Sequence, residues 1–214
     1  NEQGMSALHV AILQGRKDIV ELLLEKGAHV NLRNISRDTP LHFAIASENV
    51  ELCNLLLNAG ADVNMQNEEE NTPLHLAVDS ENENVIKLLI SFGANVNSQN
   101  EHGDTPLNNA VEYENENVIK LLISFGADVN LQDTFRSPLH ISAQSGNVEL
   151  CNLLLQNGAN INSQNGEGNT PLHFAAKFGN VELYKLLLQN GADINSQNQF
   201  QDTPLHLAIV YFKI

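Results

Sequence analysis

One tetrapeptide recurs along the chain at an almost constant interval, and this periodicity constrains the fold more than any other feature. Thr-Pro-Leu-His or a close variant begins at seven positions: Ser6, Thr39, Thr72, Thr105, Ser137, Thr170 and Thr203. Successive copies are 33, 33, 33, 32, 33 and 33 residues apart. A second marker, Gly-Ala-Asp/Asn/His-Val/Ile-Asn, keeps the same interval from Gly27, Gly60, Gly93, Gly126, Gly158 and Gly191. This period indicates a solenoid in which each repeat stacks on its neighbours.

Each repeat carries the signals for two short helices. In the second repeat, Thr39 can cap a helix N-terminus and Pro40 suits the first helical position. A second amphipathic segment spans residues 50–57 and is followed by Gly60, which we expect in the left-handed conformation that ends a helix. Small residues at the sixth motif position would let neighbouring helices approach closely: Ala11, Ala44, Ala77, Ala110, Ser142, Ala175 and Ala208. Helices this short need stacking to persist in water.

These motifs resemble the ankyrin repeat family, whose signature is Thr-Pro-Leu-His-x-Ala and whose period is 33 residues. The resemblance covers residues 1–214 and implies an all-α repeat fold, an ankyrin solenoid of helix-turn-helix units joined by β-hairpin loops. It divides a single solenoid domain into the end of a preceding hairpin (1–5) and seven repeats at 6–38, 39–71, 72–104, 105–136, 137–169, 170–202 and 203–214. Because the last of these only starts a repeat, we expect the sequence to be an excerpt from a longer array.

Three departures from the repeat pattern carry information. The glycine between the two helices, present at Gly15, Gly146 and Gly179, is replaced by Glu48, Glu81 and Glu114. We expect the next residue, Asn49, Asn82 or Asn115, to take the positive φ that these turns need. Asn108 replaces the motif histidine, and the hairpin at 133–136 is one residue shorter than the others, which predicts a displaced tip.

The histidines and cysteines are predicted to be structural. Six of the eight histidines hold the fourth motif position: His9, His42, His75, His140, His173 and His206. Residues one repeat apart lie at about the 8–10 Å spacing of packed helices, whereas zinc ligands converge at about 2 Å. We therefore expect each imidazole to bond the Thr hydroxyl and the hairpin backbone. Cys53 and Cys151 are predicted to be reduced core residues, which favours a cytoplasmic setting.

No catalytic or cofactor-binding motif occurs in the sequence. It has no nucleophile–base motif and no phosphate-binding glycine loop between a strand and a helix. We therefore predict no enzyme activity, no cofactor and no metal.

Charge is distributed unevenly along the chain. The net charge is −15, and the segment from Asp38 to Asp133 has 17 acidic and two basic residues, so it carries the whole excess. This charge argues against binding to nucleic acid or to an anionic membrane surface. Two interpretations stay open: carboxylates that keep the protein soluble, or a surface that attracts a basic protein partner.

The family resemblance also implies a binding face. In ankyrin proteins the concave side, built from hairpin tips and exposed first-helix positions, binds the partner. In this sequence those positions are Glu69, Asp79, Ser80, Glu101, His102, Asp104, Glu112, Tyr113, Phe135, Arg136, Lys177, Phe178 and Phe200. The four aromatic residues and Arg136 are of the types that anchor interfaces. The alternative interpretation is that the aromatic side chains pack one hairpin on the next.

The resemblance thus predicts a protein–protein interaction array that sequesters or recruits a protein partner through its concave face, and we expect this segment to be monomeric. The 30 asparagines and duplicated strings such as NVELCNLLL are compatible with an AT-rich genome. They favour the recognition segment of a larger host-directed effector, located in the cytoplasm or in a host cytoplasm. The alternative is a structural tether or regulatory region of a channel or anchoring protein.

Overall fold

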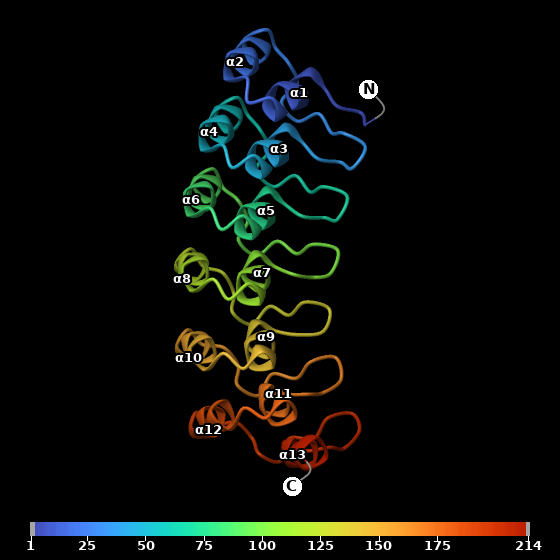
Figure 1. Cartoon of the computed structure of the whole chain (residues 1–214), viewed down its shortest axis with the longest axis vertical. Helices are drawn as coiled ribbons and strands as arrows, with labels where there is room; N and C mark the ends of the chain where they lie inside the picture. The colour runs from blue at the N-terminus through green and yellow to red at the C-terminus, as the bar shows by residue number, and fades with distance from the viewer. Residues whose placement is uncertain (1–2, 213–214) are drawn as a thin grey trace. The chain divides into compact units, whose positions relative to one another are not determined.

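The computed structural model describes residues 3–212, with the backbone alone for Phe212. Within this range the chain forms thirteen helices and no strand (Figure 1): α1 (Ala7–Leu13), α2 (Lys17–Glu25), α3 (Pro40–Ala46), α4 (Val50–Asn58), α5 (Pro73–Asp79), α6 (Glu83–Ser91), α7 (Pro106–Glu112), α8 (Glu116–Ser124), α9 (Pro138–Ser145), α10 (Val148–Gln156), α11 (Pro171–Phe178), α12 (Val181–Gln189) and α13 (Pro204–Phe212). The predicted all-α repeat fold is confirmed.

The chain divides into two compact units, Asn1–Glu101 (unit 1) and His102–Ile214 (unit 2). In unit 1 the helices pair as α1 with α2, α3 with α4 and α5 with α6, and α1, α3 and α5 stack in order. In unit 2 the pairs are α7 with α8, α9 with α10 and α11 with α12, and α7, α9, α11 and α13 stack in order. The predicted repeat boundaries follow the same order of elements and stay a prediction.

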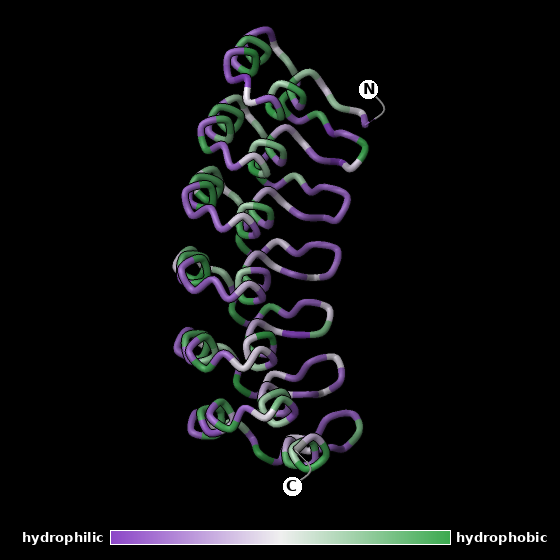
Figure 2. Tube along the Cα trace, viewed as in Figure 1, coloured by the Kyte–Doolittle hydropathy of each residue, from purple (hydrophilic) through white to green (hydrophobic). Residues whose placement is uncertain are grey.

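The core of each unit is formed by the motif residues. Leu41, Ala44 and Ile45 of α3 are fully buried, as is Cys53 of α4. Hydrophobic residues concentrate in the helices and hydrophilic residues in the loops (Figure 2). Because a buried aliphatic side chain contributes about 1.5–3 kcal/mol, the stacked motif positions supply most of the stability.

The loops between repeats are turns, so the predicted β-hairpins are correct in position but not in strand content. In the described residues the loop at 67–71 closes through the Asn67 amide, which donates to the Asn71 carbonyl at 3.0 Å. One further backbone bond, from the Glu68 amide to the Ser36 carbonyl at 2.9 Å, joins it to the preceding loop. Such isolated bonds hold each loop against its neighbour without forming a ladder.

The prediction for the turns between paired helices was wrong. Glu48, Glu81 and Glu114 themselves adopt positive φ, at 53°, 56° and 56°. The following asparagine is needed elsewhere, because Asn49 caps α4 and its side chain accepts a hydrogen bond from the Leu52 amide at 3.0 Å. A residue in the left-handed region could not hold its side chain in this capping position, so the strain falls on the glutamate. Gly60 has φ 88° and ends α4 as predicted.

Candidate functional site

The motif histidines fasten each first helix to the loop that follows it. His140 is fully buried, its Nδ1 lies 2.7 Å from the Ser137 hydroxyl, and its Nε2 lies 2.9 Å from the Asn169 carbonyl oxygen. Burial lowers the pKa of His140 to about 4, so the ring is neutral at neutral pH. The same pair of contacts occurs at His9, His42 and His173. The structural role predicted for these histidines is confirmed.

The cysteines also lie in the core, as predicted. Cys53 and Cys151 are unpaired and fully buried, and burial raises the pKa of each thiol to about 12. Within residues 3–212, no three His, Cys, Asp or Glu side chains are grouped so that they could hold a metal ion. Among the same residues, no helix is both long and apolar enough to cross a membrane.

In unit 1 the predicted binding residues lie on loops and at the end of a first helix. Glu69 and Glu101 are exposed in adjacent loops, which are joined by a bond from the Glu101 amide to the Glu69 carbonyl at 3.1 Å. Asp79 is the exposed last residue of α5, and the Ser80 hydroxyl donates to the Ala77 carbonyl at 3.1 Å. The structure thus brings the two glutamates together and leaves Ser80 engaged with its own helix.

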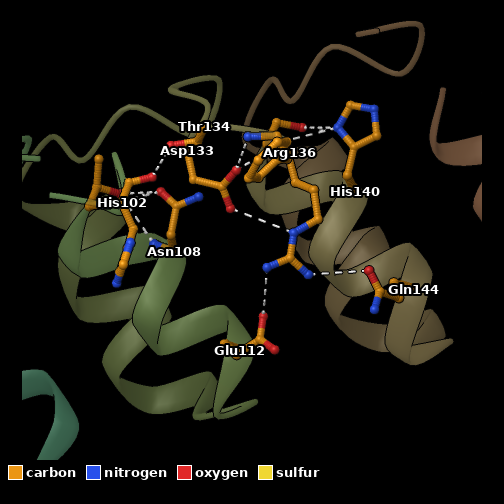
Figure 3. A network of polar contacts seen from close by, with 11 residues as sticks. His102, Asn108, Glu112, Asp133, Thr134, Arg136, His140 and Gln144 are labelled. Carbon is orange, nitrogen blue, oxygen red and sulfur yellow. Dashed lines mark hydrogen bonds and ion pairs between the residues drawn. The ribbon is translucent and has the colours of Figure 1, made fainter. Parts of the chain in front are cut away.

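In unit 2, Arg136 connects a loop to two first helices (Figure 3). Its guanidinium lies 3.5 Å from Glu112 at the end of α7, 3.5 Å from Asp133 in its own loop, and 3.2 Å from the Gln144 side-chain oxygen of α9. Arg136 is thereby held in place before any partner arrives. A preorganised arginine loses less conformational freedom on binding than a mobile one.

Arg136 also lines a hollow of about 180 Å³ within unit 2. The lining combines apolar, charged and aromatic side chains: Val111, Glu112, Arg136, Ile141, Gln144, Ser145 and Phe178. A concave surface that combines apolar and polar side chains is suited to receive a side chain of a partner.

Four predicted aromatic residues lie on the surface of unit 2. The exposed fractions are 57% for Tyr113, 65% for Phe135, 51% for Phe178 and 71% for Phe200. Phe178 stacks on Phe174 with ring centroids 6.4 Å apart, and the Lys177 ammonium lies 5.7 Å from the Phe178 centroid. The aromatic rings are therefore open to solvent over about half of their area or more, rather than packed between loops. We call Glu112, Tyr113, Phe135, Arg136, Lys177 and Phe178 the loop-side face.

Three predicted residues of unit 2 are not part of the loop-side face. His102 is exposed, and its carbonyl accepts from the Thr134 amide at 3.0 Å, which joins the first two loops of the unit. Asp104 is partly buried and interacts with Asp133. Phe200 lies in the 198–202 loop and does not line the hollow.

Sequence reasoning missed Asp133, whose side chain is only 6% exposed. Burial, followed by the charge of Asp133, raises the pKa of Asp104 to about 6, and Arg136 opposes this shift. A signal was present in the sequence, because the matching position is asparagine in the other loops: Asn34, Asn67, Asn100, Asn165 and Asn198.

The chain belongs to the ankyrin repeat family. A family model described as ankyrin repeats (three copies) matches residues 1–67, 41–133 and 139–213. Ankyrin repeat domains mediate protein–protein interaction, and they bind protein partners.

Two solved structures illustrate the similarity. The ankyrin repeat domain of Bcl-3, described as a unique member of the IkappaB protein family, is 30% identical with a TM-score of 0.87, over 99% of this chain and 100% of that chain. The human ASB11 ankyrin repeat domain is 31% identical with a TM-score of 0.79, over 95% of this chain and 92% of that chain. No curated protein matches the chain.

Proposed function

We propose that the chain binds a protein partner of basic character through its loops and the C-terminal ends of its first helices, and so sequesters or recruits that partner. The observation that carries the proposal is the loop-side face of unit 2, where exposed Phe178 and the held Arg136 line a hollow. Exposed Tyr113 directly follows Glu112, which lines the same hollow. Aromatic residues and arginine supply most of the binding energy at protein interfaces. The predictions of a host-directed effector, of a tether and of a cytoplasmic location stay predictions, since no structural observation favours one of them.

The basic character of the partner follows from charge. The two lysines inside the acidic segment are already paired on their own helices, Lys87 with Glu83 at 3.0 Å and Lys120 with Glu116 at 2.5 Å. These pairs leave an acidic surface that would accelerate association with a cationic partner.

The aromatic part of the proposal is tested by alanine substitution after the partner has been captured and identified. Tyr113→Ala and Phe178→Ala should each weaken affinity by about 30-fold, because a buried aromatic anchor contributes about 2 kcal/mol. Matched controls lie on α10 of the same unit: Glu149→Ala and Asn152→Ala should change affinity less than about threefold. Circular-dichroism melts must show that every variant folds. Equal losses from α10 and loop-side variants would exclude this face.

The charge part is tested by salt. Raising ionic strength from about 0.05 to 0.5 M should slow association far more than it changes dissociation, because it shortens the Debye length severalfold. An association rate that does not depend on salt would leave the acidic segment as a solubility feature.

A further inference from the structure

Neighbouring loops are joined side chain to side chain by one recurring contact. In unit 1, Asn67 Nδ2 donates to Asp38 Oδ1 at 3.1 Å, and Asn100 Nδ2 donates to Asn71 Oδ1 at 3.0 Å. In unit 2, Asn198 Nδ2 donates to Asn169 Oδ1 at 2.8 Å. In each case a side-chain amide nitrogen of one loop donates to a side-chain oxygen of the loop before it. Neither side chain has to gain or lose a proton to form this bond.

The contact is different between the loops at 100–104 and 133–136. The two residues that face each other there both belong to unit 2. Asp133 replaces the asparagine and has no N–H donor, and the residue opposite it is another aspartate, Asp104. Two carboxylates can share a hydrogen bond only if one of them carries a proton.

The surroundings decide which aspartate carries the proton. Asp133 Oδ1 accepts from the Phe135 amide at 2.6 Å and from the Arg136 amide at 2.5 Å, and its Oδ2 lies 3.5 Å from Arg136 Nε. These three donors engage both carboxylate oxygens of Asp133. Asp104 is therefore the group that holds the proton and donates it to Asp133.

The other charged groups near this pair are few. His102 and Arg136 act on Asp104, Arg136 is also paired with Glu112, and Asp133 acts on His140. Because the pKa of His140 is about 4, its ring stays neutral from pH 5 upwards. The buried Asn108 side chain lies beside Asp133 (Figure 3), and its Nδ2 has no hydrogen-bond partner among the described residues.

We propose that a single proton between Asp104 and Asp133 controls how firmly the 133–136 loop is held, which makes this loop a pH-responsive element. With the proton in place, the hydrogen bond joins the loop to the segment before α7; without it, two carboxylates face each other and the loop opens more often. The loop presents Phe135 and Arg136, so its effect on partner binding rests on the proposed function.

The direction with pH follows from the pKa of about 6 that burial and the Asp133 charge give Asp104, compared with its ordinary value of 3.8. A carboxyl whose pKa is raised by folding stabilises the folded state at low pH, and this stabilisation is lost as pH rises through the folded value. The loop should therefore be held more firmly at about pH 5 than above about pH 7.

The test is amide hydrogen exchange by NMR on the isolated chain, without a partner. Between about pH 5 and 7.5, the protection factors of the Thr134 and Arg136 amides should fall about tenfold beyond the change in intrinsic rate. Asp133→Asn restores the donor found in the other loops, so its change over the same range should be less than about threefold. His102→Gln removes the imidazole that acts on Asp104 and should leave the tenfold fall in place.

Two further measurements keep the outcome decisive. The Asp104 carboxyl carbon should titrate near pH 6 in the native chain and at lower pH in Asp133→Asn. Asn67→Asp places a second carboxylate opposite Asp38 in unit 1, and should make the Glu69 and Asn71 amides newly sensitive to pH. Equal pH dependence in the native chain and in Asp133→Asn would overturn the proposal. If exchange follows the prediction but partner affinity does not change with pH, the loop is pH-responsive as proposed. The assignment of partner binding to the loop-side face is then wrong.

Discussion

Within unit 2, residues 105–136 build one helix pair with its loop, and residues 137–202 build two more of the same kind from different side chains. The later segment keeps the family residues: a motif histidine, a glycine between the helices and an asparagine in the loop. The earlier segment replaces them with Asn108, Glu114 and Asp133. Stacking on neighbouring helices is therefore sufficient to impose the backbone even when three local interactions are changed.

Each of the three changes in segment 105–136 has an energetic cost. Asn108 leaves a buried nitrogen without a partner, Glu114 holds φ at 56°, and Asp133 places two carboxylates together. Because stability in a solenoid is a sum of repeat and interface contributions, this repeat should open first. The repeat that we expect to open first thus carries Arg136, the centre of the proposed binding face.

The largest difference should appear when the fourth motif residue is removed from both segments. His140→Ala loses the contacts with Ser137 and the Asn169 carbonyl together with the volume of a fully buried ring. We expect a loss of about 3 kcal/mol in the free energy of unfolding. Asn108→Ala also removes a buried nitrogen that has no partner, so it should cost about 1 kcal/mol or less. Urea unfolding with hydrogen exchange compares the two, and similar losses would contradict the contrast.

Acidification should weaken the later segment. Burial lowers the pKa of His140 from 6.5 to about 4, so the unfolded chain takes up a proton at higher pH than the folded one. This contribution to stability is complete above pH 6.5 and is lost as pH falls toward 4, by about 2 kcal/mol at pH 5. The contribution of Asp104 to stability changes in the opposite direction over part of the same pH range. Unfolding measured from about pH 7 to 5 should show a smaller loss in His140→Asn than in the native chain.

The comparison also shows what a sequence can predict here. The period, the helix caps and the glycine at the end of each second helix depend on residues close in sequence, so helices and core were predicted correctly. The positive φ at Glu114 was assigned to Asn115 because asparagine adopts the left-handed conformation more readily than glutamate. Only the capping bond from Val118 to Asn115, at 3.1 Å, decides between them.

The candidate site was predictable only in part, for a related reason. Exposed positions such as Tyr113 and Phe178 follow from the helix period and were identified from the family pattern. The Asp104–Asp133 pair joins residues 29 apart, and its chemistry depends on burial and on three donors that no local pattern reports. Contacts between repeats can therefore be identified only from the folded structure.

A gain in stability should follow when the family residue is restored at position 108. In Asn108→His, Nδ1 can take over the contacts to Thr105, and Nε2 comes within reach of the loop carbonyls that Asn108 cannot bond. The variant gains one hydrogen bond and no longer buries a nitrogen without a partner. It should therefore be more stable by about 1 kcal/mol. Thermal and urea unfolding measure the gain. His173→Asn is the matched reverse change, and a gain from that substitution would show that the histidine contacts do not stabilise the stack.

The smallest expected effect concerns the turn between the paired helices. Glu114→Gly removes a side chain from a left-handed position at φ 56°, which costs a non-glycine residue about 1 kcal/mol. The substitution also loses an exposed bond from Asn147 Nδ2 to Glu114 Oε2 at 3.0 Å, and it makes the unfolded chain more flexible. These losses reduce the expected gain to about 0.5 kcal/mol.

The opposite change in the later segment calibrates this gain. Gly146 has φ 78°, and a Cβ there would lie 2.8 Å from Asn180 Nδ2, whose donation to the Gly146 carbonyl at 2.7 Å it would disturb. Gly146→Ala should therefore destabilise by about 1–2 kcal/mol, more than Glu114→Gly stabilises, because strain and a displaced hydrogen bond act together. Glu81→Gly in unit 1, where φ is also 56°, should repeat the small gain. If Glu81→Gly and Glu114→Gly both lowered the unfolding midpoint, the glutamates would be stabilising these turns rather than straining them.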